Sequence, residues 1–295
     1  MSGASLHFLP ESLAAAMKLA ASLDIPVHEI AVHHFPDGES RVHIHPVKGT
    51  AILFSSLNDP NEKLLHLAFA AATLRSDGAG RVILVAPYLC YMRQDKAFET
   101  GDAVSQRIIG DYLSRYFDRV ITVDPHLHRI NSLQSIFTDC QADVLSASSV
   151  IAETLAVEMD GDLLLVGPDA ESLQWVGAIA KQLDVPFIVA TKVRHGDRDV
   201  EVHFADAQRI REAKVVILDD LISSGMTVCR ATEALLKAGA KAVEVIAVHA
   251  LCSDADLNTI RAAGVSSIRS TDSVPHSTNA ISLALLLRSA LMEEV

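Results

Sequence analysis

A short segment around Asp219 combines residue types that could bind a phosphorylated sugar. A hydrophobic run ends in Asp219 and Asp220, and a helix is expected over Ala231 to Ala238. Between them lies a turn of small residues made of Ser223, Ser224, Gly225, Met226 and Thr227. Such a turn at a helix N-terminus presents backbone N–H groups and hydroxyls, which bind phosphate without a cation, and the carboxylates would face sugar hydroxyls. The alternative is an ordinary helix cap with solvated acids.

Two further groups of residues could hold a nucleotide and its metal ion. Arg93, Gln94 and Lys96 can grip a polyphosphate, with Arg as a bidentate fork and Lys as a point charge. His126 and Asp169 offer one imidazole and one carboxylate, sparse ligation that suits a Mg²⁺ ion that keeps waters and shares phosphate oxygens. For the first group the alternative is a solvated charged loop, and two ligands alone are weak support for a metal site.

Two more cations follow a strand that is expected over Phe187 to Ala190. Lys192 and Arg194 lie at the end of this run, and the polar residues after them predict a loop. Cations on a loop that closes over a substrate can stabilise the charge that develops in phosphoryl transfer. The alternative is a plain exposed loop.

Zinc and disulfides are less favoured by the sequence. Arg41, His43 and His45 would share one face of a strand by their spacing, which permits zinc, but the ordinary alternation of polar residues explains the pattern better. The four cysteines are far apart and form no Cys-x-x-Cys pair, so we interpret them as reduced thiols.

Short hydrophobic runs that alternate with alanine- and leucine-rich segments must position these side chains. Runs of this length suit strands that are buried on both faces, with helices between them, as in a parallel α/β sheet. The expected strands cover residues 51–54, 81–86, 119–123, 162–166, 214–218 and 243–248.

The chain also repeats itself. The stretch from Leu6 to Val27 recurs from Leu163 to Phe187, and the stretch from Ala51 to Val85 recurs from Val215 to Ile246. The offset is about 160 residues in both cases, which is the size of a domain and too long for a solenoid repeat. We therefore expect two copies of one α/β domain, each a mostly parallel sheet flanked by helices.

The domain boundaries follow from the repeat and from local polarity. We expect an N-terminal domain over residues 1–141 and a C-terminal domain over 142–276, because the polar stretch Thr138 to Asp143 is a natural junction. A C-terminal helix within residues 277–295, with its apolar residues from Ala280 to Met292, could pack back on the first domain.

Composition excludes several classes of protein. With 49% hydrophobic and 21% charged residues, the 295-residue chain is globular rather than disordered. Its net charge of −12 repels phosphate backbones, so we expect no nucleic-acid partner. The N-terminus lacks the basic region of a signal peptide, and apolar runs such as Ile281 to Leu287 are too short to span a bilayer. We expect no membrane partner and a cytoplasmic location.

The acidic pair and its turn resemble the phosphoribosyl-diphosphate loop of the type I phosphoribosyltransferase fold. Further segments are similar to motifs of the ribose-phosphate pyrophosphokinase family, and they occur in that family's order across nearly the whole chain. These segments are Phe35-Pro-Asp-Gly-Glu39, Tyr91-Met-Arg-Gln-Asp-Lys96, Val123-Asp-Pro-His126, Gly167-Pro-Asp-Ala170, Thr191-Lys-Val-Arg194 and Ser270-Thr-Asp-Ser-Val-Pro275. The family is itself a tandem duplication of one α/β domain, as the internal repeat predicts here.

The resemblance implies a fold, a reaction and a set of site residues. The fold is two tandem phosphoribosyltransferase-like domains, and the reaction is Mg²⁺-dependent transfer of the diphosphoryl group of ATP to ribose 5-phosphate, giving phosphoribosyl diphosphate and AMP. It also implies a homo-oligomer, either a dimer or a hexamer. By residue, it implies catalysis by Lys192 and Arg194, Mg²⁺ held by His126 and Asp169, ribose 5-phosphate bound by Asp169, Asp219, Asp220 and residues 223–227, and ATP bound by Phe35, Asp37, Glu39, Arg93, Gln94, Lys96 and His126.

The turn departs from the family's common pattern at three positions. Ser223 stands where relatives commonly have a third Asp, Ser224 replaces a Thr, and Met226 replaces a Gly that would permit positive φ. Two rival hypotheses remain: a catalytically weak or silent homologue that acts as a regulatory or interaction subunit, and a phosphoribosyltransferase that consumes the diphosphate. The retained Lys192 and Arg194 argue against the first rival, and the duplication argues against the second.

Overall fold

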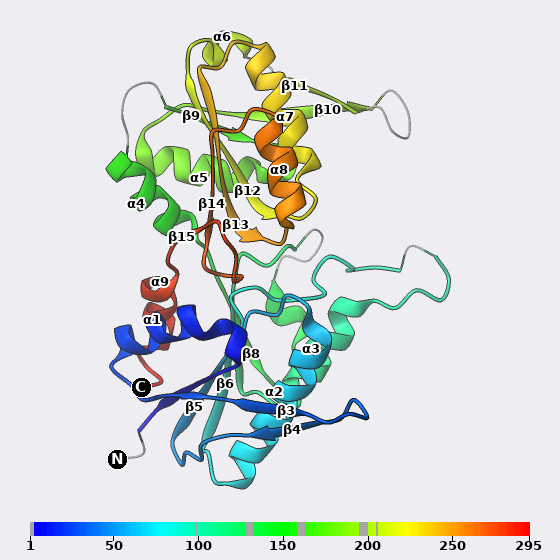
Figure 1. Ribbon diagram of the computed structural model, residues 1–295, viewed down its shortest axis with the longest axis vertical. Helices are drawn as coiled ribbons and strands as arrows, with labels where there is room; N and C mark the ends of the chain where they lie inside the picture. Colours follow the sequence, from blue (N-terminus) through cyan, green and yellow to red (C-terminus); the bar gives the residue numbers. More distant parts are fainter. Residues whose placement is uncertain (1–2, 98, 128–131, 159–162, 195–199, 205) are drawn as a thin grey trace. The chain divides into compact units, whose positions relative to one another are not determined.

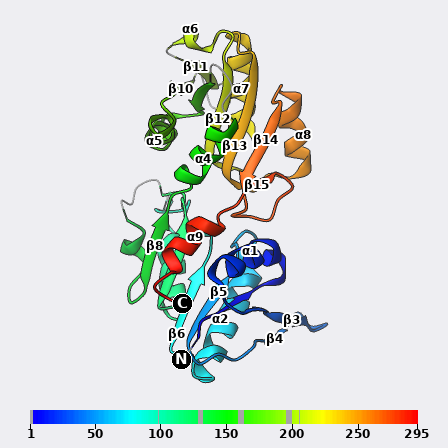
Figure 2. The ribbon, with the colours of Figure 1, turned by 90° about the vertical axis from the view of Figure 1, so that its left-hand side faces the viewer.

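The chain is divided into two compact units (Figure 1). The computed structural model describes residues 3–97, 99–127, 132–158, 163–194, 200–204 and 206–295, and the side chains of residues 174, 192–194, 200–202 and 207 lie outside that description. The first unit comprises Met1–Ser146, Ser273–Pro275 and Ser282–Val295, and the second comprises Ala147–Asp272 and His276–Ile281. In both units helices flank a central sheet (Figures 1 and 2).

In the described part of the first unit, six strands form a parallel sheet in the order β2-β1-β5-β6-β7-β8. The strands are β1 (Ser5–Phe8), β2 (Val27–Glu29), β5 (Thr50–Phe54), β6 (Arg81–Val85), β7 (Arg119–Val123) and β8 (Gln141–Leu145). Strands β3 (Ala31–His34) and β4 (Ser40–His43) form a separate antiparallel hairpin. The helical elements are η1 (Pro10–Ser12), α1 (Leu13–Leu23), α2 (Pro60–Ser76), α3 (Ser105–Ser114) and η2 (Leu133–Ile136).

The described part of the second unit forms a seven-stranded sheet in the order β11-β10-β9-β12-β13-β14-β15. Its β10–β11 pair is antiparallel and the other pairs are parallel. The strands are β9 (Leu163–Gly167), β10 (Phe187–Arg194), β11 (Val200–Phe204), β12 (Lys214–Ile222), β13 (Ala242–Ala250), β14 (Ser267–Thr271) and β15 (Asn279–Ile281). The helical elements are α4 (Ser148–Glu158), η3 (Ala170–Ser172), α5 (Leu173–Leu183), α6 (Ala207–Ile210), α7 (Met226–Lys237) and α8 (Asp254–Ala262).

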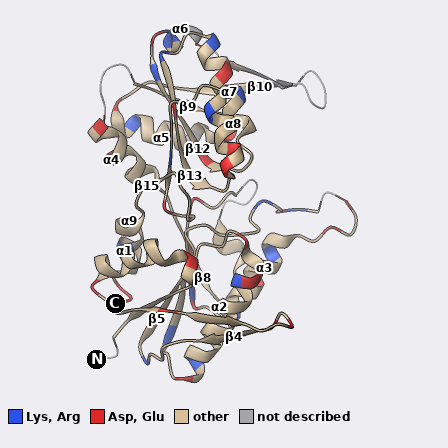
Figure 3. Ribbon diagram, in the orientation of Figure 1, with Lys and Arg blue, Asp and Glu red and all other residues tan. Residues whose placement is uncertain are grey.

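The predicted α/β class and the predicted strands are confirmed. Each of the six hydrophobic runs forms a strand, and the residues at the centre of β5, β6, β9 and β12 are fully buried, as a sheet covered on both faces requires. Acidic and basic residues are interspersed over both units (Figure 3). No helix in the described ranges is both long and apolar enough to cross a bilayer.

The two units share one topology, which confirms the duplication. The order β2-β1-β5-β6-β7-β8 corresponds position by position to β10-β9-β12-β13-β14-β15. The likeness reaches single residues: α1 and α5 each follow a short 3-10 helix, and each ends at an aspartate in the left-handed conformation, Asp24 with φ 55° and Asp184 with φ 54°. The antiparallel strand β11 is the element that the second sheet adds.

Two boundaries differ from those expected. The first unit continues to Ser146, because the polar stretch taken as a junction runs into β8, which pairs with β7 along its whole length. The expected C-terminal helix is shorter, because residues 279–281 form β15 at the edge of the second sheet. The helix itself is α9 (Ala284–Leu291), which belongs to the first unit and lies beside α1 (Figures 1 and 2).

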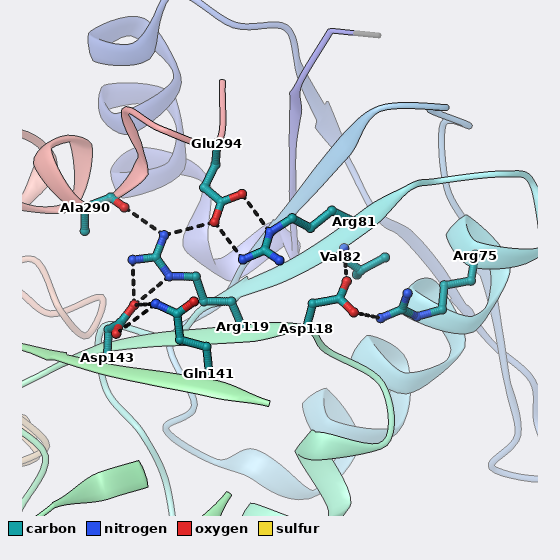
Figure 4. A network of polar contacts seen from close by, with 9 residues as sticks. All are labelled: Arg75, Arg81, Val82, Asp118, Arg119, Gln141, Asp143, Ala290 and Glu294. Carbon is teal, nitrogen blue, oxygen red and sulfur yellow. Dashed lines mark hydrogen bonds and ion pairs between the residues drawn. The ribbon is translucent and has the colours of Figure 1, made fainter. Parts of the chain in front are cut away.

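A network of charged side chains fixes the end of the chain on the first unit (Figure 4). Arg81 and Arg119 are the first residues of β6 and β7, and both contact Glu294, at 2.7 Å from Arg81 Nε and 3.1 Å from Arg119 Nη1. Arg119 also donates to the carbonyl of Ala290 at 2.9 Å and pairs with Asp143 of β8. The C-terminal residues therefore cover the amino ends of two central strands.

Candidate active site

Three carboxylates meet at the carboxyl edge of the second sheet. Strand β12 runs past its expected end and includes both Asp219 and Asp220, with Asp219 in register with Ala247 of β13. Asp169 follows the neighbouring strand β9 and caps η3, where its Oδ1 accepts a hydrogen bond from the Glu171 amide at 3.2 Å. Adjacent parallel strands end at the same edge of a sheet, so these side chains gather although 50 residues separate Asp169 from Asp219 in the sequence.

The gathering of these acids has an electrostatic consequence at Asp219. Burial raises the pKa of the Asp219 carboxyl well above its usual range, and the charges of Asp220 and Asp169 raise it further. A hydrogen bond with the Asp220 side chain acts in the same direction. The edge thus concentrates negative charge at a point where a cation or hydroxyl donors would relieve it.

The turn after β12 leads directly into the N-terminus of α7. Gly225 has φ 71° and is the N-cap of α7, and a Cβ at this position would lie 2.5 Å from Ile260 Cδ1. The helix begins at Met226, earlier than the expected Ala231, so the free N–H groups of its first turn lie within the Ser-rich segment. Ser223, Ser224 and Met226 are exposed. Met226 is helical, so its φ is negative, and the position that needs positive φ is still a glycine.

The residues expected to hold adenine lie at the tip of the β3–β4 hairpin. The Phe35 amide donates to the Glu39 carbonyl at 2.8 Å, and the Glu39 amide donates to Asp37 Oδ1 at 3.1 Å, which closes the turn. The Phe35 ring packs edge-on against His33 and is 41% exposed. All three side chains therefore face solvent in this chain.

The residues expected to hold the polyphosphate follow two neighbouring strands of the first sheet. Arg93, Gln94 and Lys96 come after β6, and His126 comes after β7, which is paired with β6. Gln94 is fixed by Ser105, the first residue of α3, whose hydroxyl donates to Gln94 Oε1 at 3.2 Å. Arg93 and Lys96 are exposed and His126 is half-buried. The carboxyl ends of β6 and β7 are adjacent, so the two segments that carry these residues begin at one edge of the sheet.

The strand that precedes the two expected catalytic cations is longer than expected and includes both of them. Strand β10 continues through Lys192 and Arg194, where a loop was expected, because β11 pairs with it at Lys192–Val202 and Arg194–Val200. Their side chains, and residues 195–199 of the expected loop, lie outside the described part of the chain.

The expected metal ligands belong to different units, His126 to the first and Asp169 to the second. Within the described residues, no group of three or more His, Cys, Asp or Glu side chains is arranged to hold a metal ion. The zinc alternative also loses its shared strand face, because β4 ends at His43 and the His45 ring stacks on His28 at 4.1 Å between centroids.

One contact was not foreseen from the sequence. Tyr91, the first residue of the segment Tyr91–Lys96, has φ 61° and donates a 2.5 Å hydrogen bond to Asn61 Oδ1 in the first turn of α2. The two residues are 30 positions apart, and neither type signals a partner. The internal repeat does indicate one difference between the units at the end of the corresponding strand. Ser55 and Ser56 of the first unit occupy the positions that Asp219 and Asp220 occupy in the second.

A duplicated α/β unit with an acidic strand end and a Gly-capped helix defines a protein of the phosphoribosyltransferase fold. The profile described as "N-terminal domain of ribose phosphate pyrophosphokinase" matches residues 7–116, and the profile "Phosphoribosyl transferase domain" matches residues 144–276. The Methanopyrus kandleri ribose-phosphate pyrophosphokinase is 31% identical over 93% of this chain and 94% of its own length. The Archaeoglobus fulgidus ribose-phosphate pyrophosphokinase 2 is 32% identical over 94% and 96%.

The chain therefore belongs to the ribose-phosphate pyrophosphokinase family. Its fold is also that of the phosphoribosylpyrophosphate synthetase of Mycobacterium smegmatis, with a TM-score of 0.84 at 24% identity, over 98% of both chains.

Proposed function

We infer that this protein is a ribose-phosphate diphosphokinase. The anomeric oxygen of ribose 5-phosphate attacks the β-phosphorus of ATP, the bond from that phosphorus to the α-phosphate oxygen breaks, and the anomeric proton is lost. The products are phosphoribosyl diphosphate and AMP. The observation that carries this proposal is the acidic edge of β12 beside the Gly225 turn, in a chain that matches a ribose-phosphate pyrophosphokinase over 93% of its length.

The second unit supplies the groups that a ribose phosphate needs. N–H groups of the first turn of α7 and the hydroxyls of Ser223, Ser224 and Thr227 would hold the 5-phosphate. Carboxylate oxygens of Asp219 and Asp220 would accept hydrogen bonds from the ribose hydroxyls, and these bonds would offset the mutual repulsion of the acids.

The acidic edge would also attract a hard divalent cation. Asp169 and Asp220 raise the pKa of the Asp219 carboxyl, so the edge has excess negative charge and oxygen ligands of the kind that Mg²⁺ prefers. We propose that Asp169 and His126 hold Mg²⁺ together with ATP. When bound, Mg²⁺ would neutralise charge on the polyphosphate.

The remaining expected residues have roles that follow from their chemistry. Arg93, Gln94 and Lys96 would bind the polyphosphate, and Lys192 and Arg194 would stabilise the charge of the transferring group. Phe35, Asp37 and Glu39 would hold the adenine of an ATP molecule that is bound at a neighbouring subunit. Their exposure at a hairpin tip agrees with this role. The arrangement requires a homo-oligomer, such as a dimer or hexamer. We propose a cytoplasmic location on the sequence grounds given above.

An assay that follows AMP in the presence of ATP, Mg²⁺ and ribose 5-phosphate tests the proposal. AMP should form when all three are present, and omission of ribose 5-phosphate should abolish it. A silent homologue would form no AMP under any condition. A phosphoribosyltransferase would instead consume added phosphoribosyl diphosphate and a base. The backbone at Met226 does not favour the silent homologue, since the residue is helical and leaves Gly225 as the left-handed position.

A further inference from the structure

A cavity of about 670 Å³ lies within the first unit, at the N-terminus of α2. Its walls come from three places in the chain: the segment after β1, the strand β3, and the first two turns of α2. Leu9 and Val32 form an apolar part of the lining. The volume lies in the range of about 300–1,000 Å³ that is typical of small-molecule sites.

The floor of the cavity holds a buried imidazole with unused hydrogen-bonding capacity. His66 lines the cavity and is 5% exposed. Its ring contacts the His34 ring edge-on at 5.7 Å between centroids, and within the described ranges the His66 nitrogens have no hydrogen-bond partner. Burial lowers the pKa of His66 and the neighbouring His34 lowers it further, while Glu62 and Glu11 act in the opposite direction. The neutral ring offers one acceptor and one donor to an occupant.

The only ammonium that lines the cavity among the described residues is already committed. Lys63 Nζ donates to the carbonyls of Ser56 at 3.0 Å and Asn58 at 2.6 Å, and to Asn58 Oδ1 at 3.1 Å. It also lies 3.8 Å from Glu11 Oε1. All three N–H donors of this ammonium are used by these acceptors, so Lys63 holds the turn before α2 and is not available to bind an anion.

Acceptors with negative charge dominate the rest of the lining. Glu11, Asp59 and Glu62 face the cavity against the single ammonium of Lys63. Asp59 and Glu62 lie at the start of α2, where the helix dipole favours acids in any case. Glu11 belongs to the first turn of η1, which leads directly into α1, and its nearest cation is the ammonium of Lys63. An occupant that carries positive charge and several N–H donors would satisfy these carboxylates and the His66 ring together.

We propose that this cavity is a binding site for a small organic cation of the amine or guanidinium class. A bare metal ion fits less well, because in the described part of the chain no three ligating side chains converge. An anion would be repelled by the three carboxylates of the lining. The cavity is lined by residues of the first unit alone, and the proposal does not rest on the proposed function.

Isothermal titration calorimetry of the full chain at pH 8 tests the site, with agmatine as the probe because it carries both an amine and a guanidinium. One agmatine should bind per chain. Glu11→Gln should weaken binding about tenfold, since it removes one charge contact. His66→Leu should weaken it by a similar factor. The Glu11 side chain is 45% exposed, so Glu11→Gln should fold even if the His66 variant does not.

Glu29→Gln is the matched control, because Glu29 is an exposed acid of the same unit that does not line the cavity. Its affinity for agmatine should equal that of the unmodified chain. Equal weakening in Glu29→Gln and Glu11→Gln would show diffuse attraction to an acidic protein and would overturn the proposal. Absence of binding at millimolar agmatine, or tighter binding of glutarate than of agmatine, would also overturn it.

Discussion

Gly225 and Ile260 approach so closely that a Cβ on the glycine would lie 2.5 Å from Ile260 Cδ1. The contact joins the turn after β12 to helix α8, and it coincides with a left-handed backbone at Gly225. The left-handed backbone and the contact with Ile260 therefore each favour glycine at this position. The shape of the proposed 5-phosphate site depends on both.

Gly225→Ala should reduce the free energy of unfolding by about 1–3 kcal/mol, because it adds backbone strain and a clash with Ile260. The KM for ribose 5-phosphate should rise in the same variant. Urea denaturation and steady-state kinetics measure the two effects. Gly78→Ala is the control, since Gly78 has φ 99° with open space around it among the described atoms, and it should show the strain alone. Equal losses in both variants would contradict the packing role of Ile260.

Met226→Gly should change the KM for ribose 5-phosphate by less than about threefold, because Met226 is the first helical residue and its φ is already negative. The expected loss of stability is at most about 1 kcal/mol, the usual effect of a glycine within a helix. A large gain of activity in this variant would show that the methionine degrades the turn. That result would favour the silent homologue.

Much of this site could be predicted from residue patterns. The hydrophobic run before Asp219 predicts a buried strand, and the small residues after Asp220 predict a turn into a helix. The proximity of Asp169 needed more information, because it depends on β9 and β12 being neighbours in the sheet. The true start of α7 at Met226 was also missed, since a Ser-Gly-Met-Thr stretch has weak helix propensity and the Gly225 cap decides where the helix begins.

Asp219→Asn should stabilise the protein at neutral pH while it impairs catalysis. The pKa of Asp219 is raised in the folded state, so the folded state binds more protons than the unfolded state between the unfolded pKa of 3.8 and the folded pKa. The stability of the unmodified protein therefore falls as pH rises through this window. The variant has no carboxyl group to ionise at this position, so its free energy of unfolding should not fall in this way and should be higher than that of the unmodified protein at pH 7. The difference between the two free energies should narrow as pH approaches 4. Urea denaturation across this pH range checks the sign, and a less stable variant at pH 7 would contradict the electrostatic account.

Glu294→Ala should destabilise the first unit by about 1–3 kcal/mol, because it leaves two half-buried guanidinium groups without their shared carboxylate. Glu293→Ala is the matched control, since Glu293 is the adjacent acid and is exposed. Thermal or urea unfolding of both variants measures the difference. A loss of the same size in Glu293→Ala would show that the effect is not specific to the contacts of Arg81 and Arg119.

The network around Glu294 and the cavity around His66 could not be read from the sequence. Arg119 and Glu294 lie 175 positions apart and meet because α9 returns to the first unit after β15 has joined the second sheet. His66 occupies a mostly apolar helix, where its type and spacing suggest only a core position. Long-range contacts of this kind depend on the tertiary fold, whereas the acidic pair and the turn are adjacent in the chain.

Phosphorus-31 NMR of a mixture of the protein with ATP, Mg²⁺ and ribose 5-phosphate tests the central claim most directly. AMP and phosphoribosyl diphosphate should appear in equal amounts as ATP disappears, and Lys192→Ala should slow both by several orders of magnitude, since a cation that meets the transferring group stabilises mainly the transition state. Formation of ADP or inorganic phosphate without phosphoribosyl diphosphate, or unchanged resonances after prolonged incubation, would contradict the assignment of this chain as a diphosphokinase.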